Sequence, residues 1–294
     1  MIASAMAKAE ILVEALPYIR QFSGKSIMVK CGGAAMVEDR LKAEVAKDVV
    51  LMRYVGMRPI IVHGGGPQIG EAMDRAGLTP SFVDGLRVTD AETMEIVERV
   101  LVGSINQEIV ALINRHGGAA VGLSGKDGGL IRARKAEPVR RKGPNAEFVD
   151  LGLVGEVATV EPKVVRALEE AGFIPVIAPT GVDETGATVN LNADLAAGEI
   201  AAALGAEKLI VLTDTDGILD RQGKLFSTLG REDVEKLIED GVIAEGMIPK
   251  VRACLRAIEG GVGKTHIING KIPHAILLEL FTASGVGTEV FTAA

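Results

Sequence analysis

The sequence predicts an α/β protein, a three-layer αβα sandwich around a mainly parallel sheet of about eight strands, arranged in two lobes. Two observations indicate this fold. Short runs rich in Val and Ile, such as residues 60–62, alternate along the chain with segments of helical periodicity. Several of these runs end in glycines or polar residues. This is typical of the carboxyl edge of a parallel sheet, where α/β folds bind their ligands.

Composition argues against several classes of protein. Hydrophobic residues make up 48% of the 294 positions, so a disordered chain is not expected. The net charge is −7 and aromatic residues reach only 3%, which argues against a nucleic-acid or membrane-surface partner. Cys31 and Cys254 are too few for a disulfide framework or a cysteine metal site. With no signal peptide or membrane-spanning run expected, the sequence predicts a reduced, cytoplasmic protein.

The first half of the chain begins with an amphipathic helix, predicted over residues 4–20 from the spacing of its apolar side chains. A first strand over 26–30 and a second that ends near His63 flank a helix over 41–55. The glycines after His63 lead into a further helix that reaches Ala76. The other elements expected in this half are a long helix over 91–115 and a strand over 119–123.

Between residues 130 and 160 the pattern changes to short alternating runs. They carry the basic residues Arg132, Arg134, Lys135, Arg140, Arg141 and Lys142. Because no aromatic residue lies among these, we interpret the segment as a solvated hairpin rather than a nucleic-acid patch. Beyond it we expect strands over 173–178, 208–213, 266–269 and 287–292, and helices over 161–172, 195–204, 232–240 and 250–259.

The stretch 59–67 is the centre of the predicted functional site. Gly64, Gly65 and Gly66 follow a strand directly and precede a helix that has Pro67 near its first turn. Such a turn presents backbone N–H groups at the positive end of a helix, where an anion can bind with no Cβ in the way. The same residues also suit an ordinary tight turn, so they leave both interpretations open.

Charged residues occupy other strand ends. Lys30 precedes Gly32 and Gly33, and Arg87 is flanked by apolar side chains, which indicates a specific partner such as a carboxylate. Polar runs follow at 190–194, 214–217 and 246–250. Two lysines, one arginine, two glycine turns and an acidic residue suit phosphoryl transfer, because that reaction needs dispersed negative charge stabilised more than it needs covalent catalysis.

Other apparent motifs are rejected because the residues or elements that should accompany them are missing. Residues 260–265 resemble a Walker A loop, but Ile258 stands where that motif needs glycine, and a helix precedes the run. The run 63–66 has no accompanying Gly-x-Ser-x-Gly elbow of an esterase, and 214–217 lacks the remaining ligands of an EF-hand. No Gly-x-Gly-x-x-Gly fingerprint follows a strand, so a dinucleotide enzyme loses support.

Five segments resemble the amino-acid kinase family, and they occur in the order that the family has. They are residues 29–33, 62–67, 84–89, 189–194 and 246–250. The resemblance spans nearly the whole chain and points to members that phosphorylate N-acetyl-L-glutamate in arginine biosynthesis. It implies ATP-dependent transfer to the side-chain carboxylate, giving N-acetyl-L-glutamyl 5-phosphate. Mg²⁺ would be bound through the nucleotide phosphates, with no metal site on the protein itself.

The resemblance also implies roles for single residues. Lys30 and Lys250 would stabilise the transferring phosphoryl group, and Asp194 would orient both lysines. The substrate-binding residues would be Gly65, Gly66, Arg87, Asn190 and Asn192, with Arg87 on the α-carboxylate. The nucleotide-binding residues would be Gly32, Gly33, Thr213, Asp214, Asp216, Gly217, Gly246 and Met247. Glu245 departs from the pattern, since many relatives have glycine there, and this puts the backbone path of that loop in question.

Two terminal features resemble the arginine-inhibited branch of these enzymes: the N-terminal helix with Tyr18, and the segment 274–288. We therefore expect a hexamer, built as a trimer of dimers and feedback-inhibited by L-arginine. Residues 1–24 would form an oligomerisation helix, 25–180 the substrate and dimerisation lobe, and 181–294 the ATP lobe with the effector region. The effector residues would be Tyr18, Lys208, His274, Glu279, Gly285 and Gly287. A regulatory signal protein is left open as a further partner.

Three alternatives stay open at this point. Another acid kinase or a carbamate kinase would share the fold, and pocket volume is invisible from the sequence. A uridylate kinase would need more cations near Arg87 than the sequence supplies. A non-catalytic arginine sensor built on a kinase fold is the alternative outside enzymes, and the presence of Lys30, Asp194 and Lys250 together argues against it.

Overall fold

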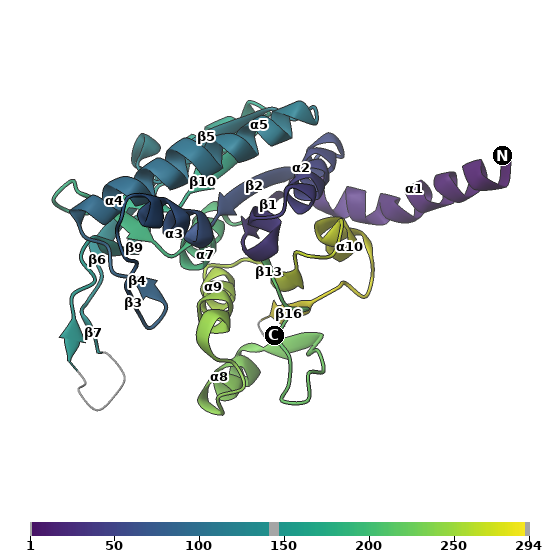
Figure 1. The fold of residues 1–294 in the computed structure, drawn as a ribbon. Coiled ribbons are helices and arrows are strands. Elements are labelled where there is room, and N and C mark those ends of the chain that lie inside the picture. The colour runs from purple at the N-terminus through teal and green to yellow at the C-terminus, as the bar shows by residue number, and fades with distance from the viewer. Residues whose placement is uncertain (1, 141–146, 292–294) are drawn as a thin grey trace.

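The computed structural model describes residues 2–140 and 147–291. Its central feature is a sheet of eight strands in the order β14–β16–β15–β13–β1–β2–β10–β5. Figure 1 labels β16, β13, β1, β2, β10 and β5 of this sheet. Neighbouring strands are parallel except for β15 and β16, which confirms the predicted fold class. The strands are β1 (Ser26–Cys31), β2 (Arg58–His63), β5 (Ala120–Ser124), β10 (Ile174–Ala178), β13 (Lys208–Thr213), β14 (Thr228–Gly230), β15 (Lys264–Asn269) and β16 (Thr288–Phe291).

Helices cover both faces of this sheet. Because successive side chains of a strand point to opposite faces, Ile27 and Val29 pack into one apolar cluster while Met28 packs into another. The first cluster includes side chains of α2 (Asp39–Tyr54), α3 (Gly66–Arg75), α4 (Ala91–Glu98), α5 (Gln107–Arg115) and α10 (Ala275–Phe281). The second includes side chains of α6 (Lys163–Glu170), α7 (Ala193–Leu204), α8 (Arg231–Glu239) and α9 (Ile248–Glu259).

The helix predicted over residues 91–115 is continuous, but its middle is not α-helical. Between α4 and α5 the chain forms a π-helical segment, η2 (Arg99–Asn106). Hydrogen bonds from residue i to i+5 place residues five apart one above the other, which changes the side chains that share a face. The sequence pattern does not reveal this segment, nor does it predict α10 and β14.

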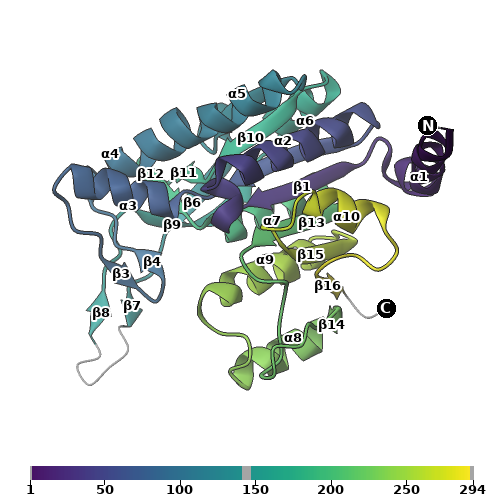
Figure 2. The same cartoon turned by 45° about the vertical axis from the view of Figure 1, so that its right-hand side comes forward.

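Helix α1 (Ile2–Phe22) extends away from the rest of the molecule in both views (Figures 1 and 2). Its carboxyl-terminal part contacts α10, where the rings of Tyr18 and Phe281 meet edge to face with centroids 6.5 Å apart. Ile11, Leu12 and Val13 are 63%, 70% and 69% exposed. A row of exposed apolar side chains on a projecting helix is typical of a surface that contacts another chain.

A smaller group of strands lies beyond the carboxyl end of the main sheet. β6 (Ile131–Lys135), β9 (Val154–Val160), β11 (Thr180–Val182) and β12 (Thr188–Leu191) pair into a closed sheet, and β3 (Phe82–Val83) pairs with β4 (Leu86–Arg87) and β7 (Val139–Arg140) with β8 (Phe148–Val149). Arg134 and Lys135 are exposed and pair with Glu156 and Asp150, as a solvated hairpin requires. Arg141 and Lys142 lie outside the described residues.

None of the helices within the described residues combines the length and the apolar character that crossing a bilayer requires.

Candidate functional site

Two glycine turns lie side by side at the carboxyl edge of the central sheet. β1 runs into Gly32 and the short helix η1 (Gly33–Met36), and β2 runs through Gly64 and Gly65 into α3. The two strands are adjacent and parallel, with Lys30 opposite Val62. A Cβ on Gly64 would lie 4.0 Å from the Lys30 ammonium nitrogen. The second glycine turn therefore forms next to a buried cation.

Lys30, Asp194 and Lys250 form a chain of charges in which Lys30 and Asp194 are buried and Lys250 is half-buried. Lys30 Nζ lies 2.8 Å from Asp194 Oδ1, and Lys250 Nζ donates to Asp194 Oδ2 at 3.0 Å. The three come from the end of β1, the first turn of α7 and the first turn of α9. Burial alone would raise the pKa of Asp194, but the charges of the two lysines outweigh it, so the pKa lies below its ordinary value. With a carboxylate between two ammonium groups, the cluster keeps one net positive charge.

A cavity of about 210 Å³ opens beside this cluster. It brings together the residues predicted to bind the substrate, because β4, β12, α3 and the start of α7 meet around it. Gly65, Gly66, Arg87, Asn190 and Asn192 line it together with Asp194. Their roles toward a ligand stay predictions, but their common location next to Lys30 is what the assignment requires.

Arg87 is held in place by groups that leave its charge unpaired. Nη2 donates to the Gly66 carbonyl at 3.1 Å, Nη1 lies 3.1 Å from Met73 Sδ, and the guanidinium carbon is 4.6 Å from the centre of the Phe82 ring. Burial lowers the pKa of Arg87, although the charge of Asp74 acts against this. No carboxylate among the described residues forms an ion pair with Arg87. An anionic ligand group would supply the missing partner.

The two asparagines predicted to bind the substrate differ in the hydrogen bonds that their side chains already make within the protein. Asn190 Nδ2 makes only a long contact, 3.5 Å, to Thr89 Oγ1, so its amide can still bind a ligand. Asn192 is the N-cap of α7, and its Oδ1 accepts from the N–H groups of Asp194 and Leu195. This cap fixes the first turn of the helix that carries Asp194.

The predicted nucleotide-binding residues fall into two groups. At the end of β13, the Asp214 carboxylate accepts from Ala34 N–H at 2.6 Å, and a Cβ on Gly33 would lie 2.3 Å from Asp214 Oδ1. This joins the turn of Gly32 and Gly33 to the run Thr213, Asp214, Asp216 and Gly217. Gly246 and Met247 belong to η4 (Glu245–Met247), which leads into α9 and Lys250.

The backbone conformation at Glu245 shows which path the loop takes where the sequence departs from the family pattern. Its φ is 44°, in the left-handed region that glycine adopts most easily. The loop therefore keeps a backbone path that suits glycine although the residue is glutamate.

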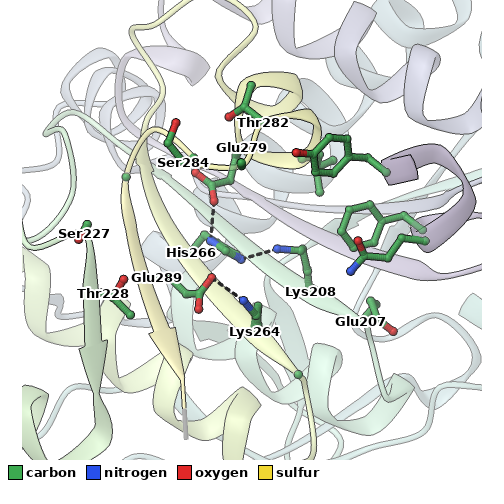
Figure 3. A pocket seen from close by; sticks show the side chains of 18 residues that line it. Glu207, Lys208, Ser227, Thr228, Lys264, His266, Glu279, Thr282, Ser284 and Glu289 are labelled. Atoms are coloured by element: carbon green, nitrogen blue, oxygen red, sulfur yellow. Dashed lines mark hydrogen bonds and ion pairs between the residues drawn. The ribbon is translucent and has the colours of Figure 1, made fainter. Parts of the chain in front are cut away.

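A larger cavity, about 660 Å³, lies at the amino-terminal end of β13, between α1 and the carboxyl-terminal elements. Figure 3 shows the side chains that line it. Its lining includes five residues of the predicted effector site: Tyr18, Lys208, Glu279, Gly285 and Gly287. Lys208 Nζ is 2.8 Å from His266 Nε2, and His266 Nδ1 is 2.7 Å from Glu279 Oε1. Burial lowers the pKa of Lys208, whereas the pKa of Glu279 falls despite burial, mainly through its hydrogen bond with His266.

His266, and not His274, is the histidine of this cavity. His274 stands at the start of α10 and binds α2 instead, with Nε2 2.8 Å from Glu44 Oε2 and Nδ1 2.5 Å from Asp48 Oδ1. His274 therefore does not line this cavity, and its predicted role toward an effector stays a prediction. The sequence carries one signal for His266, a histidine directly before the apolar pair Ile267 and Ile268 of a strand.

Among the described residues no group of three or more His, Cys, Asp or Glu side chains is arranged to hold a metal ion.

Comparison with known proteins places the chain in a family. The model of the amino acid kinase family matches residues 25–269. A curated acetylglutamate kinase from Heliobacterium modesticaldum is 58% identical over 290 residues, which are 97% of this chain and 98% of that protein.

Solved structures support the same placement. The N-acetylglutamate synthase of Neisseria gonorrhoeae, complexed with coenzyme A and N-acetyl-glutamate, is 28% identical with a TM-score of 0.83, and the match covers 97% of this chain and 64% of that one. The same synthase complexed with coenzyme A and L-arginine is 26% identical with a TM-score of 0.81, covering 97% and 66%. The chain belongs to the amino acid kinase family.

Proposed function

We propose that this protein transfers the γ-phosphoryl group of ATP to the side-chain carboxylate of N-acetyl-L-glutamate, as a step of arginine biosynthesis. The observation that carries the proposal is the Lys30–Asp194–Lys250 cluster next to a cavity that contains the unpaired cation Arg87. The name of the relative that is 58% identical over almost its whole length supports the same reaction.

Each group has a physical task in this reaction. Arg87 would pair with the α-carboxylate, and Asn190 would bind the acetyl-amide end, so that the second carboxylate points to the phosphoryl group. Lys30 and Lys250 would stabilise the negative charge on the oxygens of the transferring group, and Asp194 would hold both ammonium groups in place. The N–H groups of Gly65 and Gly66 would donate to phosphoryl oxygens.

The residues present suit a magnesium nucleotide. Gly33 is exposed, and neither Gly32 nor Gly33 carries a Cβ, so Lys30 and Asp214 can approach a turn whose backbone a triphosphate could contact. Mg²⁺, bound through the nucleotide phosphates, would neutralise part of their charge.

The same proposal includes regulation and assembly. An amino acid with a guanidinium group, L-arginine, would fit the larger cavity, with Glu279 for the guanidinium and Lys208 for the carboxylate. The related synthase structure that contains L-arginine supports this choice. The exposed apolar side chains of α1 would join dimers into a hexamer, and the enzyme would work in the cytoplasm.

A coupled ADP-release assay tests the proposal. With Mg-ATP, we expect turnover with N-acetyl-L-glutamate but not with glutamate, aspartate or carbamate, and suppression of that turnover by L-arginine. Turnover that arginine leaves unchanged would support the proposed kinase activity and contradict the proposed inhibition by arginine. Turnover with carbamate alone would show that carbamate, and not N-acetyl-L-glutamate, is the substrate. Arginine binding without any turnover would indicate a non-catalytic arginine sensor.

A further inference from the structure

His63 and Asn106 form a buried polar pair directly behind the glycine turn. His63 is the last residue of β2 and Asn106 is the last residue of the π-helical segment η2, and both side chains are almost fully buried. His63 Nδ1 lies 3.0 Å from the Gly64 carbonyl oxygen, and His63 Nε2 lies 3.2 Å from Asn106 Nδ2. Neither side chain was assigned a role by the sequence.

The hydrogen bonds of Asn106 determine which ring nitrogen carries the proton. Asn106 Nδ2 also donates to the Val176 carbonyl at 2.9 Å, so the atom facing His63 is the amide nitrogen, a donor. His63 Nε2 must therefore accept, and Nδ1–H donates to the Gly64 carbonyl. Burial lowers the pKa of His63 to about 4, which keeps the ring neutral in this form.

This donation orients the peptide unit between Gly64 and Gly65. The Gly64 N–H is already bound to the Cys31 carbonyl at 3.0 Å, and the Gly64 carbonyl is bound to His63. The carbonyl and the N–H of a planar trans peptide point in opposite directions. The Gly65 N–H therefore points away from His63, and it has no acceptor among residues 2–140 and 147–291. Gly65 lines the cavity beside Asp194.

The π-helical segment supports the turn from a second side. A Cβ on Gly65 would lie 2.5 Å from Ile105 Cδ1 and 2.7 Å from Leu101 Cδ2, so both side chains contact the glycine closely. Because i to i+5 hydrogen bonding stacks residues five apart, Leu101 and Asn106 face the turn together. An α-helix would turn Asn106 away from it.

Stability alone does not explain Asn106. Its Oδ1 is buried without a hydrogen-bond partner among the described residues, which costs free energy that an apolar side chain would avoid. A Cβ on Gly122 would lie only 2.0 Å from this oxygen, so the neighbouring strand must also keep glycine to accommodate it.

We propose that His63 and Asn106 are positioning residues that lock the Gly64–Gly65 peptide, so that the Gly65 N–H donates to the phosphoryl group in transfer. Asn106 selects the histidine tautomer, and the histidine selects the peptide orientation. The inference rests on the phosphoryl transfer proposed above, because it specifies how one of its donors is held.

Three variants test the role in catalysis. His63→Leu removes the donor to Gly64, His63→Asn keeps an amide N–H near the position of Nδ1, and His116→Asn makes the same change at a histidine outside the site. We expect His63→Leu to lower kcat about 10- to 100-fold with little change in the KM for acetylglutamate, since the bond matters most in the transition state. His63→Asn should recover most of the loss, and His116→Asn should match the wild type.

A spectroscopic measurement tests the same claim without substrate. In ¹⁵N-histidine NMR spectra of the free protein, His63 should be the Nδ1–H tautomer in the wild type and lose that preference in Asn106→Leu. An Nε2–H tautomer in the wild type would overturn the positioning role whatever the substrate is. So would an unchanged kcat in a folded His63→Leu variant, or equal losses in the Leu and Asn variants. Absence of any acetylglutamate turnover in the wild type would instead overturn the proposed function.

Discussion

At the scale of single residues, the site is built from charges whose burial is costly. Lys30 and Asp194 are 5% and 6% exposed. Buried ion pairs contribute little to stability, because desolvation offsets most of their attraction. Two ammonium groups around one carboxylate leave a positive charge that nothing in the cluster neutralises. A phosphoryl group whose oxygens carry negative charge throughout the transfer is the partner such a site suits.

Replacing either lysine tests this assignment. Lys30→Ala and Lys250→Ala should each lower kcat about 10²- to 10³-fold, since one lost transition-state cation costs about 3–4 kcal/mol. Steady-state kinetics would measure the effect, with Lys135→Ala, which loses only an exposed pair with Asp150, as the matched control. Turnover close to that of the control in either variant would refute the role.

His63 predicts a specific dependence of stability on pH. Its pKa falls from 6.5 to about 4 on folding, so between these values the unfolded chain binds more protons than the folded one. The stabilisation is fully present above pH 6.5 and is lost as the pH falls toward 4. From about pH 7.5 to about pH 5, the wild type should lose about 2 kcal/mol more of its unfolding free energy than His63→Asn. Urea titrations at both pH values would measure this, and equal losses would contradict the buried neutral histidine.

At the scale of elements, the helices, strands and turns that could be predicted are those with a strong local sequence pattern. Both glycine turns follow runs of Val and Ile, so β1, β2 and the start of α3 could be placed from the sequence. The π-helical segment could not, because it does not change the apolar spacing that marks a helix, and α10 could not, because its seven residues are too few to show that spacing. The sequence also does not indicate that His266, and not His274, lines the larger cavity. Only the pairing of β13 with β15 and the packing of α10 bring His266 between Lys208 and Glu279.

The contact between α7 and α9 gives a prediction at this scale. A Cβ on Gly198 would lie 2.6 Å from the Ala253 carbonyl oxygen and 3.0 Å from its Cα, so the helices touch backbone to backbone. These helices carry Asp194 and Lys250, whose side chains are 3.0 Å apart.

Gly198→Ala should therefore push the two helices apart. We expect a loss of about 1–3 kcal/mol in stability and a lower kcat. Gly70→Ala is the control, because Gly70 lies in α3 with nothing within 4 Å of its added Cβ. Thermal melting and steady-state kinetics would measure both variants, and a Gly198→Ala protein as stable and active as the control would contradict the close packing.

At the scale of the whole molecule, one sheet runs across the division predicted near residue 180. β1 pairs with β13 over Ile27 to Lys30, so strands from both predicted lobes hydrogen-bond to each other. The residues proposed for phosphoryl transfer gather at this junction, whereas the larger cavity lies between α1 and α10. The division into a substrate lobe over residues 25–180 and an ATP lobe over 181–294 stays a prediction.

Truncation of residues 1–20 tests the link between assembly and regulation. The deletion removes the exposed apolar part of α1. It also removes Tyr18, which lines the larger cavity. The shortened protein should be smaller than a hexamer in light scattering, and L-arginine should inhibit it much more weakly. Its turnover without arginine should stay close to that of the full chain. If the truncated protein assembled and responded to arginine like the full chain, α1 would be needed for neither assembly nor inhibition.

The most direct test of the central claim is identification of the product by trapping. An acyl phosphate reacts with hydroxylamine to give a hydroxamate, whereas a phosphate ester or a phosphoramidate does not. Incubation with Mg-ATP, N-acetyl-L-glutamate and hydroxylamine should release ADP and form one equivalent of the side-chain hydroxamate, identified by mass spectrometry. ADP release without any hydroxamate would contradict transfer to a carboxylate, and with it the reaction assigned to Lys30, Asp194 and Lys250.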